Sequence, residues 1–346
     1  MVRRRPTSRK KKGRGAAGVF PIFLLLMSLA AGAVAWLLLA PFGPQTETFV
    51  EIAPGSSVAR VGQLLESSGI VRSRYAFDFE RILRRGTLKA GEYRFDHPAP
   101  PDEVYARIAR ADVFTRAITV PEGANIFDIA ARLEHEGFCK HQDFLDAAIK
   151  QKALVADLDP AAASLEGYLF PDTYHFPRIA TPVQIVSAMV KRFHSVASQL
   201  GLKDNVHLVV TMASLVERET AVDAERPLVA SVFQNRLAKK MPLMTDPSII
   251  YGLELEGRWR GAIYQSDLAR NTVYNTYLHA GLPPGPIANP GAKSLRAAMY
   301  PATSDYLYFV AAGANPQGKS LFARTLDEQV RNVAGYRHAV KKAGGR

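Results

Sequence analysis

Apolar residues recur at helical spacing in the second half of the chain, and a carboxylate interrupts the clearest series. Leu208, Met212, Leu215, Glu219 and Val222 follow one another at intervals of four, three, four and three, which places them on one face of a helix. A carboxyl on a half-buried face near a helix C-terminus, where the dipole disfavours negative charge, has a raised pKa. Such a group can act as a general acid near neutral pH.

Glu217 stands two residues before Glu219 and provides an internal comparison. A two-residue step turns about 200° around a helix, so Glu217 is predicted to share a less consistently apolar face with Val210, Ser214 and Ala221. The alternative for Glu219 is that it only ends the helix and turns to solvent. Of the two carboxylates, Glu219 is the one that the pattern marks as unusual.

The pattern around this carboxylate predicts a run of helices with a corner after it. Pro227 is well placed as the first residue of a second helix, so residues 220–226 are predicted to form a short turn. Residues 141–156 and 181–201 also have helical periodicity, and the helix before the corner is predicted to begin at about Val206. The aromatic segment LEGYLFPDTYHFP between the earlier helices is predicted to be irregular.

Polar and aromatic motifs follow the corner. Thr245 and Asp246 precede a proline, residues 274–277 read YNTY, and residues 281–291 read GLPPGPIANPG. The last segment is too rich in proline and glycine for a helix or strand and too stiff for a linker, which predicts a rigid loop. Aromatic and amide residues near such a loop are typical of a carbohydrate cleft. A plain structural turn is the alternative for this loop.

Several motifs, in a fixed order, carry a resemblance to a known family. They read KAGEYRF, LEGYLFPDTY, TMASLVERETAVDAER, VASVFQNRL, TDPSIIYG, YNTY, GLPPGPIANPGAKSL and YLYFVA. From about Phe49 to the C-terminus the chain resembles the endolytic murein transglycosylases of the MltG (YceG-like) family. The resemblance implies a membrane-anchored lyase that cuts peptidoglycan strands internally and ends their elongation, working beside penicillin-binding synthases. It also implies that Glu219, the residue before the threonine of the E-x-E-T motif, is catalytic.

Membership in these motifs also suggests which residues contact substrate. The candidates are Glu217, Asn235, Thr245, Asp246, Tyr251, Tyr274, Asn275, Tyr277, Pro284 and Asn289. Glu166 is a further motif carboxylate for which a structural or positioning role is expected. Ser320 and Gln329 stand where many family members carry histidines, so no role of those histidines is transferred.

The implied chemistry needs one carboxylate. A glycosidic hydrolase ordinarily uses two, whereas a lytic transglycosylase protonates the bridging oxygen and lets the sugar's own C6 hydroxyl close a 1,6-anhydro ring, with orientation replacing the second group. Asp246 is therefore expected to hold a loop through bonds to the backbone. Two other hypotheses stay open, a hydrolase that recruits Asp246 or Glu217 and a non-catalytic scaffold that binds the wall.

The N-terminal residues have the pattern of a membrane anchor. Residues 19–40 carry no charge and as a helix would span about 33 Å. The chain has a net charge of +12, most of it in the basic tail of residues 1–18, which the positive-inside rule assigns to the cytoplasm. The alternatives are a cleaved signal peptide and a basic patch for nucleic acid. A single-pass protein of the cell inner (plasma) membrane, with its catalytic region outside, is the prediction.

An internal repeat follows the predicted anchor. The pattern PGxxVxxVxxxLxxxGI beginning at Pro54 matches EGxxIxxIxxxLxxxGF beginning at Glu122. Each copy predicts a turn, an amphipathic helix and a glycine cap after a strand. We expect LysM-like modules, which either bind glycan or serve as a spacer. Near the C-terminus, YLYFVAA is predicted to be a strand with SLFART as its partner.

The fold class expected is α+β, with a transmembrane helix, LysM-like strand and helix modules and a helix-rich catalytic domain. The single cysteine, Cys139, excludes an intrachain disulfide. Scattered histidines give no metal site, and the sequence has no phosphate loop or dinucleotide fingerprint, so no cofactor is expected. The predicted divisions are a tail 1–18, a transmembrane helix 19–40, a linker 41–48, a LysM-like region 49–140 and a catalytic domain 141–346.

Overall fold

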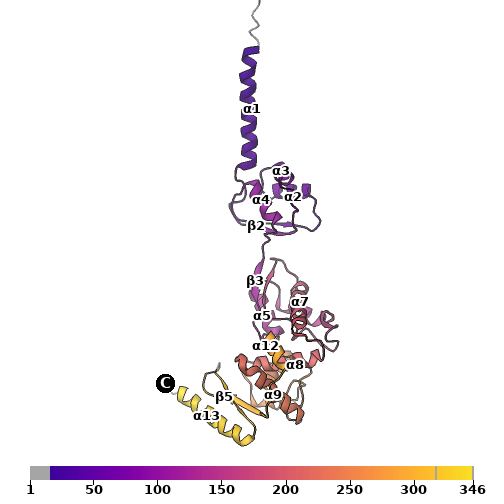
Figure 1. Ribbon diagram of the computed structural model, residues 1–346, viewed down its shortest axis with the longest axis vertical. Coiled ribbons are helices and arrows are strands. Elements are labelled where there is room, and N and C mark those ends of the chain that lie inside the picture. Colours follow the sequence, from indigo (N-terminus) through magenta and orange to yellow (C-terminus); the bar gives the residue numbers. More distant parts are fainter. Residues whose placement is uncertain (1–15, 316–317, 345–346) are drawn as a thin grey trace, which may run out of the picture. The chain divides into compact units, whose positions relative to one another are not determined.

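The computed structural model describes residues 16–315 and 318–344, which form two compact units (Figure 1). The first unit ends at Thr115 and the second begins at Arg116. Helices predominate in both, and the described strands form two-stranded antiparallel sheets. The predicted mixture of helix and strand is confirmed.

The first unit begins with one long apolar helix, α1 (Ala16–Leu39). Its stretch Phe20–Leu39 has a mean hydropathy of 2.5 and is long and apolar enough to cross a membrane. This agrees with the anchor predicted for residues 19–40. Most of the basic tail, residues 1–15, lies outside the described residues.

The body of the first unit packs three helices on a small sheet. Its core includes Val61, Leu65, Phe77, Tyr93 and Ile108, all nearly or fully buried. The elements are β1 (Thr48–Ile52), α2 (Val58–Ser67), α3 (Arg74–Arg84), β2 (Gly91–Phe95) and α4 (Pro101–Ala109), with β1 antiparallel to β2. The predicted first strand and first repeat helix are therefore present.

The second unit is larger and consists mostly of helices. Its first half contains β3 (Arg116–Thr119), α5 (Ile126–His135), α6 (His141–Lys150), η1 (Lys152–Val155), β4 (Thr173–Phe176) and α7 (Pro182–Leu200). Its second half contains α8 (Val206–Glu219), η2 (Asp223–Glu225), α9 (Arg226–Ala238), α10 (Asp246–Leu255), α11 (Gln265–Leu268), α12 (Ala292–Met299), β5 (Tyr308–Ala311), β6 (Ser320–Ala323) and α13 (Leu326–Gly344). The predicted helices, and the late strand with its partner, are confirmed.

Local sequence signals explain where the helices begin and end. The Thr181 side chain accepts from the backbone N–H of Gln184 at the start of α7, and Gly201 ends that helix at φ 71°. Asn125 caps α5 in the same way with Asp128. In both repeat copies a glycine closes the helix at positive φ, Gly69 at 68° and Gly137 at 67°.

One local prediction was wrong. The segment LEGYLFPDTYHFP was expected to be irregular, but its end forms β4, which pairs antiparallel with β3. Tyr174 and Phe176 point into the core while Thr173 and His175 are exposed. The alternation of buried and exposed residues that marks a strand covers only a short stretch after a proline. The many aromatic residues of the segment concealed it.

The second repeat copy lies in the second unit, because the chain divides after Thr115. Glu122 to Phe138 thus form part of the body that carries Glu219. The repeat is a turn, a helix and a glycine cap in both copies. Its likeness to LysM units stays a prediction.

Helix α8 is buried more completely than its pattern predicted. Met212 and Leu215 are buried as expected, but Leu208 is 53 % exposed, and Val222 lies beyond the end of the helix. Val210 and Ser214 are fully buried. The face that Glu217 shares with Val210 and Ser214 was predicted to be less consistently apolar, and it is nevertheless buried because α12 packs on α8.

Candidate functional site

Glu219 is the last residue of α8 and stands at a corner of the chain. The helix ends because Thr220 adopts an extended conformation, with φ −142° and ψ 134°. The Thr220 hydroxyl then accepts a hydrogen bond from the Val222 N–H over 3.1 Å, which starts the turn toward α9. The predicted corner is confirmed, and α9 begins at Arg226, one residue before the expected Pro227.

The Glu219 side chain lines a cavity of about 190 Å³. The wall combines one further carboxylate, one guanidinium, three aromatic rings and apolar or hydroxyl groups. The lining residues are Glu219, Phe233, Arg236, Leu243, Met244, Thr245, Asp246, Tyr277 and Phe309. Four residues predicted from the motifs, Glu219, Thr245, Asp246 and Tyr277, are thus brought together around one space.

The surroundings of Glu219 raise the pKa of its carboxyl to near neutrality. Burial raises the pKa of its carboxyl to about 7, and the negative charge of Asp246 acts in the same direction. Arg236 and Arg218 lower that pKa and so oppose the shift. Within residues 16–315 and 318–344 the Glu219 carboxyl makes no hydrogen bond. It is therefore an acid whose proton is available to a molecule in the cavity.

Asp246 holds a position in this cavity that differs from the one expected. It was predicted to fix a loop through bonds to the backbone, but its Oδ1 accepts a hydrogen bond from the Tyr277 hydroxyl over 2.6 Å, and it does not cap α10 through its side chain. Burial raises the pKa of Tyr277 well above its ordinary value, and Asp246 adds to the shift. Asp246 and Tyr277 therefore form one hydrogen-bonded pair on the cavity wall.

A cluster of hydroxyl groups fixes the loop that carries Asp246. The Thr276 hydroxyl accepts a hydrogen bond from the Thr245 N–H over 3.0 Å, and the Ser248 hydroxyl donates to the Thr245 carbonyl over 2.8 Å. The Ser248 and Thr276 hydroxyls are 2.9 Å apart. Because Thr245 precedes Asp246 and Thr276 precedes Tyr277, this buried cluster sets the spacing of the pair.

Arg236 lines the cavity and was missed by the sequence analysis. Its Nε donates to the Leu307 carbonyl over 2.7 Å and its Nη1 to the Leu243 carbonyl over 2.8 Å, which hold the guanidinium in place. The adjacent Asn235, which was predicted, donates instead to the carbonyls of Ser304 and Tyr306. The signal for Arg236 was its place in the same NRL motif.

Glu217 belongs to a different and fully paired cluster. Its Oε1 accepts from Nη1 of Arg226 over 2.7 Å, and its Oε2 accepts from the Gly291 N–H over 2.9 Å. Arg226 Nη1 also donates to the Ser294 hydroxyl over 2.6 Å. The Glu217 and Arg226 side chains are only 5% and 6% exposed. Glu217 therefore links the C-terminal end of α8 to the first residue of α9 and to the end of the proline-rich loop.

Asn289 and Glu166 join the proline-rich loop to the first half of the unit. The fully buried Asn289 amide donates to the Ala124 carbonyl and to Glu166 Oε1, both over 2.9 Å, and accepts from the Leu169 N–H over 2.8 Å. Burial raises the pKa of Glu166 to about 8. Both Glu166 oxygens accept hydrogen bonds, Oε1 from Asn289 and Oε2 from the Ile126 N–H, so a raised pKa alone does not distinguish an acid from a structural carboxyl.

The remaining predicted residues are not among those that line this cavity. Tyr251 is buried, with its ring centroid 5.1 Å from that of Tyr274. Asn275 is fully buried and donates to the carbonyls of Leu268 and Arg270. Pro284 is exposed, and its carbonyl lies 3.0 Å from Nε2 of His207.

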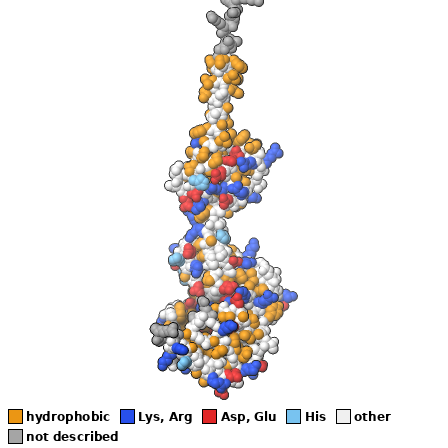
Figure 2. Space-filling view, turned by 60° about the vertical axis from the view of Figure 1, so that its left-hand side comes forward, with side chains coloured by type: hydrophobic (Ala, Val, Ile, Leu, Met, Phe, Trp, Pro, Cys, Tyr) orange, Lys and Arg blue, Asp and Glu red, His pale blue; other side chains and the backbone are white. Residues whose placement is uncertain are grey.

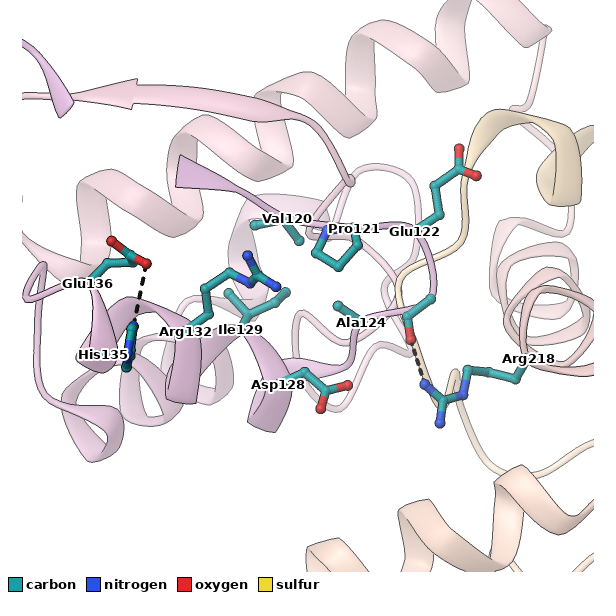
Figure 3. A pocket seen from close by; sticks show the side chains of 11 residues that line it. Val120, Pro121, Glu122, Ala124, Asp128, Ile129, Arg132, His135, Glu136 and Arg218 are labelled. Carbon is teal, nitrogen blue, oxygen red and sulfur yellow. Dashed lines mark hydrogen bonds and ion pairs between the residues drawn. The ribbon is translucent and has the colours of Figure 1, made fainter. Parts of the chain in front are cut away.

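A second, larger cavity of about 550 Å³ lies beside α5 (Figure 3). Arg132 and Asp128 project from α5 into it, and Arg218 Nη1 donates to the Gly123 carbonyl over 3.0 Å, whereas Glu122 points away from them. This bond ties the turn of the second repeat copy to α8. Burial raises the pKa of Glu122 in its wall, and the negative charge of Glu217 acts in the same direction. Among the described residues no cluster suits a metal ion.

Comparisons with known proteins show the family to which the chain is similar. The YceG-like family matches residues 50–335. The endolytic murein transglycosylase of Bacillus subtilis (strain 168) is 35% identical over 82% of this chain and 83% of its own length. That of Streptococcus pneumoniae (serotype 2, strain D39) is 30% identical over 91% of this chain, which spans 64% of the pneumococcal protein. The crystal structure of a YceG-like protein from Listeria monocytogenes has 32% identity and a TM-score of 0.54, covering 83% of this chain and 99% of that one.

Proposed function

This chain belongs to the YceG-like family, and from this premise we propose that it is a lyase, an endolytic lytic transglycosylase of peptidoglycan. The bond cleaved is the β-1,4 bond from N-acetylmuramic acid to N-acetylglucosamine. The observation that carries the proposal is the Glu219 carboxyl, which has a pKa raised to about 7, makes no hydrogen bond within the described residues, and lines a cavity.

In the proposed reaction Glu219 donates one proton and then accepts a different one. Its carboxyl protonates the bridging oxygen as the C1–O bond of N-acetylmuramic acid breaks, which releases the 4-hydroxyl of N-acetylglucosamine. The Glu219 carboxylate then takes the proton of the C6 hydroxyl, whose oxygen attacks C1 and closes the 1,6-anhydro ring. The carboxyl is restored, and no water enters the product.

The residues around Glu219 support each half of this cycle. The Asp246 charge favours the protonated carboxyl before cleavage, whereas the Arg236 charge favours the carboxylate that forms during it. The rings of Phe233, Tyr277 and Phe309 provide faces on which a sugar can stack.

For the other motif residues the predicted sugar contacts stay predictions. Tyr274 and Pro284 are accessible enough to make them. Glu217, Asn235, Tyr251, Asn275 and Asn289 give the hydrogen bonds or packing described above to the protein itself. We propose that these five residues hold the cavity wall in place.

We further propose a place for this activity in the cell. The apolar helix α1 anchors the chain, and the basic residues before it favour a cytoplasmic N-terminus and an exported catalytic region. Peptidoglycan lies on that side of the membrane. Cleavage close to the membrane would end the elongation of nascent strands, with penicillin-binding synthases as the expected partners.

A hydrolase is the second candidate, because Asp246 faces the same cavity as Glu219. A second carboxylate could activate water, and the product would then carry a reducing end instead of an anhydro end. The fixed bond from Tyr277 to Asp246 leaves one Asp246 oxygen free for such a role. A non-catalytic scaffold would not need an acid with a pKa near neutrality.

Mass spectrometry of the products separates these candidates. Purified glycan strands are digested with the full chain and with its Glu219→Gln variant. We expect products that end in 1,6-anhydro-N-acetylmuramic acid, one water lighter than hydrolytic products, and far less of them from the variant in the same time. Reducing-end products would support the hydrolase, and intact strands with a folded protein would support the scaffold.

A further inference from the structure

Helix α3 in the first unit has an apolar face that nothing in the described chain covers. Tyr75, Phe79, Ile82 and Leu83 are 66%, 47%, 69% and 66% exposed. Their spacing places them on one side of the helix. The opposite side, which includes Phe77, is buried in the core of the first unit. The helix is therefore folded onto its body and still presents a second apolar stripe.

Positive charge flanks this stripe. Arg81 lies within α3 and Arg85 caps its end, and both are exposed. Neither forms an ion pair in the described part of the chain. Arg84, by contrast, is paired with Glu80 and Asp102. An apolar stripe beside unpaired arginines is the composition of a helix that lies in the interface of an anionic membrane.

The body of this unit is held close to the end of α1. Phe42, three residues after the last residue of α1, exchanges two backbone hydrogen bonds of 3.1 Å with Ala99. Three extended residues reach at most about 10 Å. The segment predicted as a linker is therefore joined to the body almost at once.

The start of α3 lies at this junction. Arg72, two residues before α3, has its guanidinium carbon 3.5 Å from the ring centroid of Trp36 in α1 and 5.1 Å from that of Phe42. Figure 1 shows α3 on the side of the body from which α1 leaves, and Figure 2 shows hydrophobic side chains gathered at that end of the body. The helix that carries the exposed stripe thus starts beside the C-terminal end of the apolar helix α1.

We propose that α3 is an interfacial helix of the same membrane. Tyr75, Phe79, Ile82 and Leu83 enter the boundary between headgroups and acyl chains, while Arg81 and Arg85 contact anionic phosphate headgroups. Two attachments, α1 and α3, then fix the orientation of the first unit on the lipid surface. This inference rests on the anchor and not on the catalytic proposal.

Spin labelling of the full chain tests the proposal. The chain carries Cys139→Ser and Ile82→Cys, is labelled with a nitroxide, and is reconstituted into vesicles of phosphatidylethanolamine and phosphatidylglycerol. Accessibility of the label to oxygen and to a water-soluble nickel complex is measured. The matched control is Ile179→Cys, because Ile179 is also exposed, at 76%, and lies in the second unit.

We expect the label at position 82 to be more accessible to oxygen than to nickel, and the label at position 179 to show the reverse. We also expect position 82 to become more accessible to nickel when phosphatidylglycerol is omitted. A label at position 82 as accessible to nickel as the control would overturn the proposal. Protection from both reagents would also overturn it, because a protein surface would then cover the stripe. Circular dichroism of each variant verifies the fold.

Discussion

The last turn of α8 carries two glutamates, one on each side, whose surroundings differ. On one side, Glu217 is buried and paired with Arg226 and the Gly291 N–H. On the other, Glu219 is close to a cavity, without a hydrogen bond in the described chain, and its pKa is raised to about 7. The paired carboxylate is used for stability, and the unpaired one is available for chemistry.

Burial alone does not separate the two roles. The Glu217 side chain is only 5% exposed, and burial raises the pKa of Glu219. Glu166, a third carboxyl, is buried and has a pKa raised to about 8 although both its oxygens accept hydrogen bonds. What differs is the set of partners. A carboxyl whose oxygens are taken by arginine and backbone N–H groups cannot exchange a proton with a ligand.

The sharpest test of this comparison is Glu219→Gln, which keeps the shape and removes the proton. We expect activity on glycan strands to fall by about 10²–10⁴-fold, measured as the rate of anhydro-end formation. The variant should be no less stable. The pKa of Glu219 is raised in the folded chain from its ordinary value of 4.5 to about 7. Ionisation of Glu219 therefore lowers the stability of the folded wild type as the pH rises from the ordinary value to the raised one. Thermal unfolding at pH 8 should therefore show a melting temperature equal to or above that of the wild type.

Glu217→Gln should have the converse effect, a loss of stability with little loss of activity. The substitution leaves the Arg226 charge with only the partly exposed Asp223 as an acidic partner. We expect the free energy of unfolding to fall by about 1–3 kcal/mol, measured by urea denaturation, with a much smaller loss of activity in the folded protein than for Glu219→Gln. Equal activity losses in two folded variants would contradict the assignment of roles.

Asp246→Asn should move the pH dependence of the reaction. Because the acid must be protonated, kcat/KM is expected to fall as pH rises through about 7. Removing the Asp246 charge removes one cause of the raised pKa, so the falling limb should shift to lower pH. The measurement is kcat/KM across pH 5 to 9. Complete loss of activity at every pH would favour the hydrolase, in which Asp246 itself acts on water.

Tyr277→Phe should have the smallest effect and serves as the control for the previous variant. It removes the hydroxyl that donates to Asp246 but leaves the carboxylate charge. We expect a loss in kcat/KM of about tenfold or less and a pH limb in its original position. A limb shifted as far as that of Asp246→Asn would show that the hydrogen bond, rather than the charge, sets the pKa of Glu219.

Much of the architecture was predictable because local signals agreed with it. Caps such as Thr181 and the glycines of the repeat fixed the ends of helices, and α8 begins at the expected Val206. The identity of the acid was also predictable, because a carboxylate at a helix end interrupts an apolar series and falls in a family motif.

The surroundings of the site residues could not be predicted, because they depend on contacts between distant segments, which the spacing of apolar residues does not indicate. Glu217 was expected on a less consistently apolar face. That pattern did not show that α12 packs on α8 or that the partners of Glu217, Arg226 and Gly291, lie in other segments. Asp246 was expected to bond to its own loop, but Tyr277, far along the chain, takes its Oδ1. Arg236 was overlooked for the same reason. A helical pattern states which face a residue shares, not which distant element meets that face.

The Asn289 amide has a consequence for the order of folding. It joins the proline-rich loop to residues more than a hundred positions earlier in the chain, through its bonds to Ala124 and Leu169. Chains are made from the N-terminus, so this bridge cannot form until nearly the whole second unit has been synthesised. We therefore expect the nascent chain to acquire its α7 and α8 helices early and its competence for catalysis last, which would spare the wall from cleavage by incomplete molecules.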